Sequence, residues 1–432
     1  MVDRLASVKE LDGWCSVCLL LRIAAGGNGI PERSDDSSIR GGSVLPRGFG
    51  YSSPDFLCQS TGELPMGFLE HRFAQLRNAA VDLRAVSMMN RRPPEVAYLG
   101  WTGRGNLGDE AIYLAHRRSG LGSMAPYPAD RFARLVRPSA KTKAVLLGGG
   151  TLVGRHDWLP RVDRITGTFP DALKFATGVG VEDPSFTGRR VYTSDEHMRA
   201  WSTRLQGFDS VSVRGPLSAA ILEKYDVETR VVGDPALLLN VPISRPVPQR
   251  EKHVVGINVA QVEDSWGGSM SRYVVELGYF VERLRALGVS SRLLSMTAGD
   301  QMLAEHFVRE HPHVELFNYR NSVDETVRAI SECNVVVGPR LHLCILAAAA
   351  GVPFISVMYK PKCLDFSLSV CMEEWSIPSD SVSSTQMVEV FEVLSSRELE
   401  IRRNLKTNVA ALRENLQSEI DLNKERIQSV AR

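Results

Sequence analysis

The chain has 432 residues, more than one hydrophobic core usually serves, so we expect two domains of roughly 150 residues each. Hydrophobic residues make up 44% and charged residues 23%, which is ordinary globular usage and excludes a fibrous, wholly disordered or membrane-embedded protein. The 51 basic and 50 acidic residues create no field of one sign. Nucleic acid is therefore not an expected partner, and any anion must be bound by local groups.

The cysteines and the N-terminal region indicate a reduced, non-membrane protein. Seven cysteines, an odd number in a long chain, are typical of free thiols in a cytoplasm. Cys15 and Cys18 form a C-x-x-C pair, but no second pair completes a zinc site, so we predict no metal site. The apolar run 17–25 contains Arg22 and is shorter than the roughly 20 residues that span a bilayer. We predict neither a transmembrane segment nor a secretion signal.

From Glu95 onward, short apolar runs alternate with helical patterns, which is typical of parallel sheets covered by helices. We therefore predict an α/β fold with two Rossmann-like, doubly wound domains that face each other across a cleft. The predicted parts are an N-terminal extension with one helix over 68–89 (1–92), a first domain (93–240), a proline-rich linker (241–252), a second domain (253–384) and C-terminal helices (385–432). The predicted strands are 96–99, 144–147, 211–213 and 230–232 in the first domain, and 254–259, 292–295, 335–337 and 354–357 in the second.

The glycine-rich segment 100–112 follows the first predicted strand and opens a helix at about Asp109. Three of its glycines match the G-x-G-x-x-G spacing of a dinucleotide site, which also needs a second strand ending in an acidic residue about 20 positions on. Asp130 lies at that distance, but 121–129 makes a poor strand. A dinucleotide site, a plain turn with Asp109 as helix cap, and a catalytic loop all stay open. We favour the catalytic loop.

Two further segments follow strands of the first domain. Gly149 is the centre of a triple glycine at the carboxyl edge of the sheet, where ligands bind in open α/β folds, although close packing explains it equally well. Arg214 follows the strand 211–213, and its planar fork suits a carboxylate or phosphate. A structural ion pair is the alternative for Arg214. Asp234, which precedes a proline, is interpreted as a turn former.

The most specific segment is 322–342. Ser322 and Glu325 form a capping box, and a buried strand then leads to Arg340 and His342 at the start of another helix. Unpaired amides and the helix dipole favour an anion there, Arg340 can clamp it, and His342 can donate a proton. Lys362 follows the next strand at the same edge, either adding charge for phosphate or being simply solvated.

Together and in this order, these segments resemble the polysaccharide pyruvyl transferase family. The matching patterns are a G-N-x-G-D-E loop, a G-G-G-T strand end, an S-V-R-x-x-x-S element, V-V-x-x-R-L-H before a helix ending in G-V-P, and Y-x-x-K. The resemblance covers about residues 95–370, and R-L-H is its most specific part. It implies a fold similar to the GT-B glycosyltransferases, no metal or nucleotide cofactor, and phosphoenolpyruvate as co-substrate for forming a pyruvate ketal on a sugar.

The resemblance also implies roles for individual residues. The expected catalytic residues are His342 and Asp109, and the expected substrate-binding residues are Arg340, Arg214, Leu341, Asn106, Gly149 and Lys362. His342 as imidazolium would be the general acid that protonates the donor's methylene carbon, and Asp109 would accept a sugar hydroxyl proton. The stretch 295–300 lacks a histidine that many relatives carry there.

Other functions remain as alternatives at this stage. A GT-B-like glycosyltransferase using a nucleotide sugar is the first, a non-catalytic sugar-binding relative the second, and a dehydrogenase a distant third. The expected partners are phosphoenolpyruvate and a sugar acceptor carried on lipid, nucleotide or polymer. We expect a cytoplasmic location, near the inner face of the plasma membrane where lipid-linked sugars are built.

Overall fold

The computed structural model describes residues 66–129, 131–186, 193–239, 253–260 and 270–430. The chain divides into two compact units, Met1–Gln75 and Leu76–Arg432, and the described strands all belong to the second. The helix expected over 68–89 is α2 (Met66–Arg91). The Cys15–Cys18 pair, Asp130 and the linker predicted over 241–252 lie outside the described residues.

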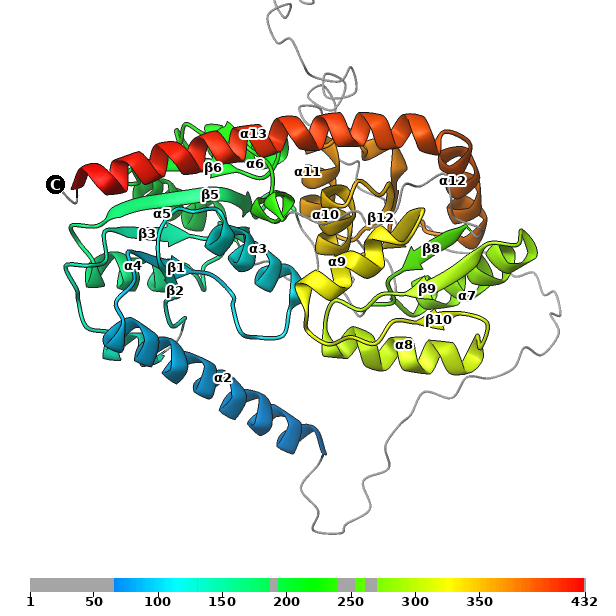
Figure 1. The fold of residues 1–432 in the computed structure, drawn as a ribbon, viewed down its shortest axis with the longest axis horizontal. Helices are drawn as coiled ribbons and strands as arrows, with labels where there is room; N and C mark the ends of the chain where they lie inside the picture. Colours follow the sequence, from blue (N-terminus) through cyan, green and yellow to red (C-terminus); the bar gives the residue numbers. More distant parts are fainter. Residues whose placement is uncertain (1–65, 130, 187–192, 240–252, 261–269, 431–432) are drawn as a thin grey trace, which may run out of the picture. The chain divides into compact units, whose positions relative to one another are not determined.

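The first sheet has seven strands among the described residues, all paired in parallel, in the order β2-β1-β3-β5-β6-β7 with β4 beside β5 (Figure 1). Its strands are β1 (Val96–Leu99), β2 (Met124–Pro126), β3 (Ala144–Leu147), β4 (Gly150–Val153), β5 (Leu173–Val181), β6 (Ser210–Val213) and β7 (Arg230–Val231). Its helices are α3 (Leu107–Arg118), η1 (Arg131–Leu135), α4 (Leu159–Thr168), α5 (Asp195–Leu205), α6 (Pro216–Glu223) and η2 (Pro235–Leu238). The judgement that 121–129 makes a poor strand is wrong for β2, which a proline can end because it lies at the sheet's edge.

Apolar residues on both faces of this sheet explain why helices cover both faces. Val96 and Tyr98 of β1 pack in a cluster with Ile420 of the C-terminal helix. The alternate residues Ala97 and Leu99 pack in a second cluster with residues of α4, α5 and α6. Successive side chains of a strand point to opposite faces, so near-continuous apolar runs need helices on both sides.

The second sheet has six parallel strands within the described residues, in the order β10-β9-β8-β11-β12-β13. Its strands are β8 (Val254–Ile257), β9 (Ser290–Leu293), β10 (Glu315–Leu316), β11 (Val335–Gly338), β12 (Phe354–Met358) and β13 (Ser376–Pro378). Its helices are α7 (Met270–Ala286), α8 (Ala298–Glu310), α9 (Val323–Ser331), α10 (Leu341–Ala349), α11 (Pro361–Ser369), η4 (Glu373–Trp375), α12 (Ser384–Ser396) and α13 (Glu398–Val430). Strand β9 ends two residues earlier than predicted, because the chain turns there toward the Thr297 cap of α8.

Both sheets are doubly wound, as predicted. In each, the first strand has its successors on both sides, so the strand order reverses between β1 and β3 and between β8 and β11. Ligands of open α/β sheets bind beyond the carboxyl ends of the strands at such reversal points. The segments that follow β1, β3 and β11, up to the first turn of the next helix where there is one, carry Asp109, Gly149 and His342. The fold therefore places the expected segments at the sheet edges where ligands bind.

Helix α13 packs on both sheets (Figure 1). Its residue Leu416 belongs to the apolar cluster of the second sheet, whereas Ile420 belongs to a cluster of the first. Arg413 donates hydrogen bonds to the carbonyl oxygens of Leu237 (2.6 Å) and Ala349 (2.8 Å), which follow strands of the two different sheets. A helix that contacts both sheets in this way restrains their separation. Among the described helices, none combines the length and the apolar character needed to span a membrane.

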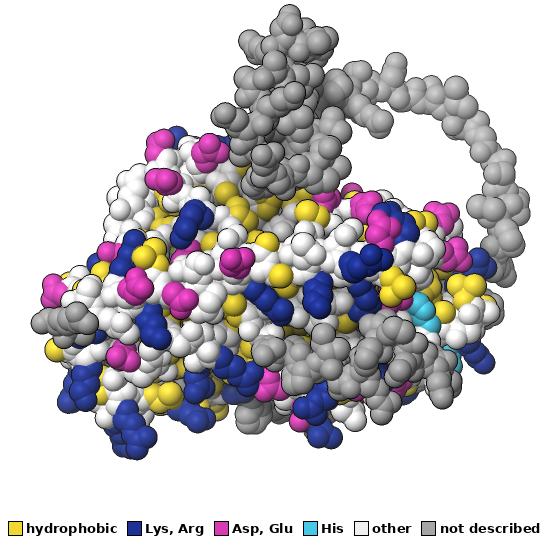
Figure 2. All heavy atoms as spheres, turned by 45° about the horizontal axis from the view of Figure 1, so that its top comes forward, with side chains coloured by type: hydrophobic (Ala, Val, Ile, Leu, Met, Phe, Trp, Pro, Cys, Tyr) yellow, Lys and Arg dark blue, Asp and Glu magenta, His cyan; other side chains and the backbone are white. Residues whose placement is uncertain are grey.

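Figure 2 shows basic and acidic side chains interspersed on the face in view. This agrees with the balanced composition of 51 basic and 50 acidic residues. Attraction of an anion therefore depends on local groups rather than on a field of the whole surface.

Candidate functional site

The loop between β1 and α3 is shaped by its own sequence. Gly103 and Gly105 adopt positive φ angles of 73° and 75°, which glycine tolerates without strain. The side chain of Asn106 caps α3 by accepting a hydrogen bond from the backbone N–H of Gly108 (3.1 Å). The helix thus begins at Leu107, two residues earlier than predicted, and Asp109 lies in its first turn rather than at its cap.

Residues from the loops after β9 and β10 and from α2 hold this loop. The backbone N–H of Leu107 donates to the carbonyl oxygen of Met296 (3.0 Å), and the Tyr319 hydroxyl donates to the carbonyl of Gly105 (3.0 Å). On the other side, Arg104 forms an ion pair with Asp82 of α2 (2.8 Å), with both side chains only 4% exposed. The loop that presents Asp109 is therefore fixed by contacts from three elements.

His342 packs directly against the start of α3. A Cβ atom at Gly108 would collide with the imidazole ring of His342, so a glycine is needed there for the ring to lie in its place. His342 is in the first turn of α10, whose N-cap is Arg340. The N-terminal ends of two helices from different sheets therefore meet at this point, beside Asp109. The helix dipoles at both ends favour a bound anion, and the N-terminus of α10 has no side-chain cap, whereas the Leu107 and Gly108 amides of α3 are already paired.

Asp109 has an unusual protonation state. Burial raises its pKa to about 7, the charge of Lys362 opposes this, and the carboxylates of Glu110 and Asp234 raise it further. Its Oδ1 atom lies 3.5 Å from the position that a Cβ on Gly150 would occupy, so the strand end after β3 is adjacent. Near neutral pH the Asp109 carboxyl group therefore exists in both the protonated and the ionised form.

His342 has the opposite shift. Burial lowers its pKa to about 3, and the positive charges of Arg214 and Lys362 lower it further. Without a bound anion the ring is therefore neutral, mainly because the side chain is only 14% exposed, and the charges of Arg214 and Lys362 add to this effect. The imidazolium predicted from the sequence belongs to the donor-bound site, where the phosphate and carboxylate of the donor would raise the pKa, and it stays a prediction. Asp109 is the group that retains a proton closer to neutral pH.

Arg214 and Asp234 lie behind His342. The Asp234 Oδ2 atom is 3.8 Å from His342 Nε2 and 3.9 Å from Arg214 Nη1. The side chains of Arg214 and Asp234 have no exposed surface, and Arg214 Nη2 donates to the Thr151 hydroxyl (3.3 Å). Burial raises the pKa of Asp234 to about 6, whereas the Arg214 charge lowers it. With no exposed surface, Arg214 lies behind the ring rather than at the site's surface.

Asp365 joins Arg214 from the second sheet. Its Oδ1 accepts from the backbone N–H groups of Leu217 (2.9 Å) and Ser218 (3.1 Å), and its Oδ2 accepts from the Ser218 hydroxyl (2.7 Å). Its Oδ2 also lies 3.7 Å from Arg214 Nε. A carboxylate of α11 thus caps the N-terminus of α6, whose own N-cap residue Gly215 has no side chain that could do so.

Arg340 is oriented by Asp300. Its Nη2 and Nε atoms donate to the Asp300 carboxylate at 2.6–3.2 Å. Asp300 has no exposed surface and also accepts from the Met296 backbone N–H (3.1 Å) and the Asn258 side chain (3.4 Å). The Arg340 side chain is 25% exposed. A rigid, partly exposed guanidinium therefore lies at the start of α10, where the strand order of the second sheet reverses between β8 and β11.

The remaining expected residues have different surroundings. Lys362 places its ammonium group 5.0 Å from the centre of the Tyr359 ring, and its charge acts on both Asp109 and His342. Leu341 is buried in the apolar cluster of the second sheet. A Cβ on Gly149 would lie 3.1 Å from Ile112 and 3.3 Å from Pro235, so close packing accounts for this glycine.

Three carboxylates of this cluster were not among the expected site residues. Asp234 was interpreted as a turn former, and its Oδ1 does accept from the Ala236 backbone N–H (2.9 Å), but its Oδ2 faces His342. Asp300 lies in the stretch where a histidine was expected, and Asp365 lies inside a helix. The one available signal was that Asp234 follows a strand at the carboxyl edge.

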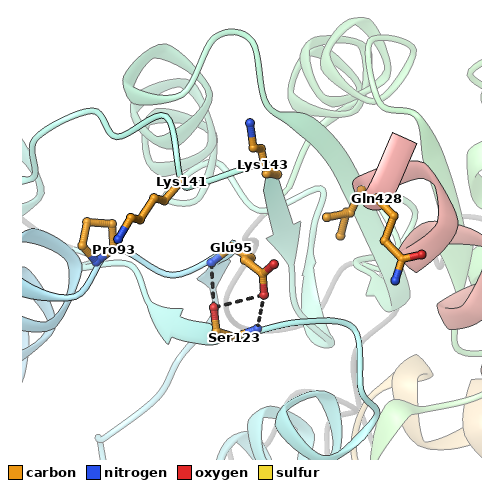
Figure 3. A pocket seen from close by; sticks show the side chains of 7 residues that line it. Pro93, Glu95, Ser123, Lys141, Lys143 and Gln428 are labelled. Carbon is orange, nitrogen blue, oxygen red and sulfur yellow. Dashed lines mark hydrogen bonds between the residues drawn. The ribbon is translucent and has the colours of Figure 1, made fainter. Parts of the chain in front are cut away.

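A surface pocket lies elsewhere on the first sheet. It has a volume of about 460 Å³ and is lined by Pro93, Glu95, Ser123, Lys141, Lys143, Ile427 and Gln428 (Figure 3). Glu95, Ser123 and Lys143 immediately precede β1, β2 and β3, so this pocket is at the amino edge of the first sheet, opposite the cluster. The Glu95 carboxylate is engaged by Ser123, whose backbone N–H donates to it (2.9 Å). Within the described part of the chain, no group of three or more His, Cys, Asp or Glu residues could hold a metal ion.

A family model described as "Polysaccharide pyruvyl transferase" matches residues 106–361, more than half of the chain. The chain belongs to this family. The matched region contains Asn106, Asp109, Arg214, Arg340 and His342, and it ends one residue before Lys362. No curated protein matches the sequence.

Several solved structures have a distant likeness to the chain. A mutant of S. aureus TarM, in complex with fondaparinux, alpha-GlcNAc-glycerol and UDP, is 12% identical with a TM-score of 0.42, over 74% of this chain and 58% of that one. The UDP-GlcNAc 2-epimerase of Neisseria meningitidis is 9% identical with a TM-score of 0.47, over 76% and 98%. E. coli heptosyltransferase WaaC with ADP is 12% identical with a TM-score of 0.38, over 70% and 98%. The chain thus spans little more than half the length of the TarM protein.

Proposed function

We propose that this member of the family is a phosphoenolpyruvate-dependent pyruvyl transferase that forms a pyruvate ketal on a sugar. The observation that supports this most directly is the cluster at the start of α3 and α10. There, two helix N-termini carry the proton-transfer groups Asp109 and His342, the charge of Lys362 acts on both, and Arg340 is the N-cap of α10. An anionic donor and a reaction that moves protons both fit that arrangement.

The donor would bind through its phosphate and carboxylate groups. The N-terminal amides of α10 and the Arg340 guanidinium provide directed donors, and Lys362 provides a second positive charge. Asp300 holds Arg340 in one orientation, so less entropy is lost when the guanidinium meets the donor. The family membership supports the assignment of phosphoenolpyruvate as this donor.

The protonation states of the free protein favour Asp109 as acid and His342 as base, the reverse of the roles expected from the sequence. C3 of the donor takes a proton from the Asp109 carboxyl group while a sugar hydroxyl oxygen bonds to C2, and that hydroxyl gives its proton to His342. The C2–O bond to phosphate then breaks, and its electron pair leaves with the phosphate. The second hydroxyl oxygen bonds to C2, and its proton goes to the phosphate. Transfer of the first proton from His342 to Asp109 restores both groups.

A transfer assay tests this proposal. The protein is incubated with phosphoenolpyruvate and a panel of sugars bearing neighbouring hydroxyls, and the products are analysed by mass spectrometry alongside phosphate release. We expect a sugar that gains one ketal-linked pyruvate, and a loss of rate of about 10²–10⁴-fold for Asp109→Asn and for His342→Gln. Lys143→Ala, which changes the pocket of Figure 3, is the control that should keep the wild-type rate.

Each alternative function gives a different result in the same assay. Transfer of a hexose from UDP-glucose, without ketal formation, would establish a glycosyltransferase instead. Sugar binding without turnover, unaffected by His342→Gln, would indicate a non-catalytic relative. We further propose a cytoplasmic location, since phosphoenolpyruvate is a metabolite of the cytosol.

A further inference from the structure

We propose that Asp234 is a positioning residue that holds the His342 proton on Nε2, so that Nδ1 is the ring nitrogen that exchanges a proton with the substrate. This inference rests on the proposed function for the identity of the substrate. The orientation and tautomer of the ring are properties of the protein alone and can be measured without any reaction.

The Nε2 atom of His342 faces the Asp234 carboxylate. This atom is buried, has no hydrogen-bond partner among the described residues, and lies 3.8 Å from Asp234 Oδ2. The same Oδ2 atom is also buried and lacks a hydrogen-bond partner in the described part of the chain, because the Ala236 backbone N–H donates to Oδ1. An ionised carboxylate is an acceptor only, so the facing imidazole nitrogen has to carry the hydrogen. A small approach of the two atoms completes the bond.

The two nitrogens of the His342 ring differ in exposure. The His342 side chain is 14% exposed, and since Nε2 is buried, Nδ1 is the ring nitrogen that a ligand can reach. Gly108 lies against Cγ and Nδ1, and Asp109 is the next residue. The nitrogen available to substrate therefore lies against the first turn of α3, which carries Asp109.

Charged groups of both signs lie around His342 and Asp234. The charged groups that face His342 and Asp234 are Arg214, which follows β6, Lys362 of α11 and Asp109 of α3. Arg214 lies 3.9 Å from Asp234 and keeps this buried carboxylate ionised. Arg214 would thus act through Asp234 rather than on the donor, which agrees with its complete burial.

These observations define what the pair can do. A neutral imidazole with its proton on Nε2 has a lone pair on Nδ1, which accepts the sugar hydroxyl proton. The imidazolium formed is then stabilised by Asp234 on its far side. No further reactant is needed, because the proton passes on to Asp109 as described above.

The test is an NMR measurement of histidine nitrogen shifts in the full-length chain labelled with ¹⁵N-histidine, with His342 assigned by comparison with His342→Gln. We expect a pyridine-type shift for Nδ1 and a pyrrole-type shift for Nε2 at neutral pH. Asp234→Asn keeps an oxygen for the Ala236 N–H but can present its amide group to Nε2, so it should shift the tautomer toward Nδ1–H. Asp365→Asn removes a charge beside Arg214 without facing His342, and should leave the tautomer unchanged.

The kinetic readout of the same variants is separate. We expect Asp234→Asn to lower kcat by about 10²-fold or more while leaving the KM for phosphoenolpyruvate nearly unchanged. A proton on Nδ1 in the wild-type protein, or the same tautomer in wild type and Asp234→Asn, overturns the inference even if pyruvyl transfer is observed. The expected tautomers with no pyruvyl transfer would instead contradict the proposed function and leave the positioning role standing.

Discussion

Asp365→Ala should destabilise the protein far more than its single position in α11 suggests. The substitution removes three hydrogen bonds that cap α6, two from backbone N–H groups and one from the Ser218 hydroxyl. It also leaves Arg214, which has no exposed surface, with one fewer carboxylate nearby. Loss of an N-cap costs about 0.5–2 kcal/mol, and breaking a buried ion pair by removing one partner costs about 3–5 kcal/mol. Since these terms overlap, we expect a total loss of about 3–5 kcal/mol.

Urea denaturation followed by circular dichroism measures this loss, with Asp324→Ala as the matched control. Asp324 also pairs with an arginine, Arg118, through two hydrogen bonds, but the side chains are 59% and 49% exposed. An exposed pair contributes about 0–1 kcal/mol. Equal losses for Asp365→Ala and Asp324→Ala would refute the reasoning, because burial of Arg214 and the shared cap would then have no energetic effect. Ser218→Ala, which removes one of the three hydrogen bonds, should lie between the two.

Three other predictions concern the cluster directly. Asp109→Asn should raise the melting temperature at and above pH 7 but not near pH 4. The pKa of Asp109 is about 7 in the folded protein and has its lower, ordinary value in the unfolded chain, so ionisation of Asp109 increasingly favours unfolding as the pH rises from that ordinary pKa to 7. A benefit independent of pH, in a thermal scan from pH 4 to 9, would contradict the shift. Gly108→Ala should lower kcat at least tenfold by displacing the His342 ring. The control is Gly167→Ala, at a helical glycine with open space around it, which should have wild-type kinetics. Similar kinetics for both variants would exclude a role of Gly108 in making room for the ring. Arg340→Lys should weaken phosphoenolpyruvate binding by about 10–100-fold in calorimetry. A lysine cannot keep the bidentate contact with Asp300 and at the same time contact phosphoenolpyruvate with a planar fork. Unchanged affinity would mean that the Arg340 guanidinium does not contact phosphoenolpyruvate.

Much of the fold follows from local sequence patterns. The buried runs that become β1, β3, β11 and β12 are short, apolar and followed by glycine or polar residues, and their positions agree with the prediction to within one residue. The reversal of strand order then brings the ends of β1 and β11 to ligand-binding edges. For that reason Asp109, Arg340 and His342 could be recognised as candidates before their geometry was known.

The supporting carboxylates could not be predicted in the same way. Asp300 meets Arg340, Asp234 meets His342, and Asp365 meets Arg214 through contacts between segments far apart in the chain. No local periodicity encodes such pairs. The protonation states were equally inaccessible, because they depend on burial. Burial lowers the pKa of His342, and the charges of Arg214 and Lys362 lower it further, which a strand-to-helix motif does not reveal.

Calorimetric titration of the purified protein shows whether the site binds phosphoenolpyruvate. Phosphoenolpyruvate and UDP-glucose are each titrated into the wild-type protein and into Arg340→Ala, with Lys143→Ala as the control. We expect phosphoenolpyruvate to bind to the wild type and to Lys143→Ala, Arg340→Ala to weaken this binding at least tenfold, and UDP-glucose not to bind. Binding of UDP-glucose in place of phosphoenolpyruvate, or phosphoenolpyruvate binding that is unchanged in Arg340→Ala, would contradict this expectation.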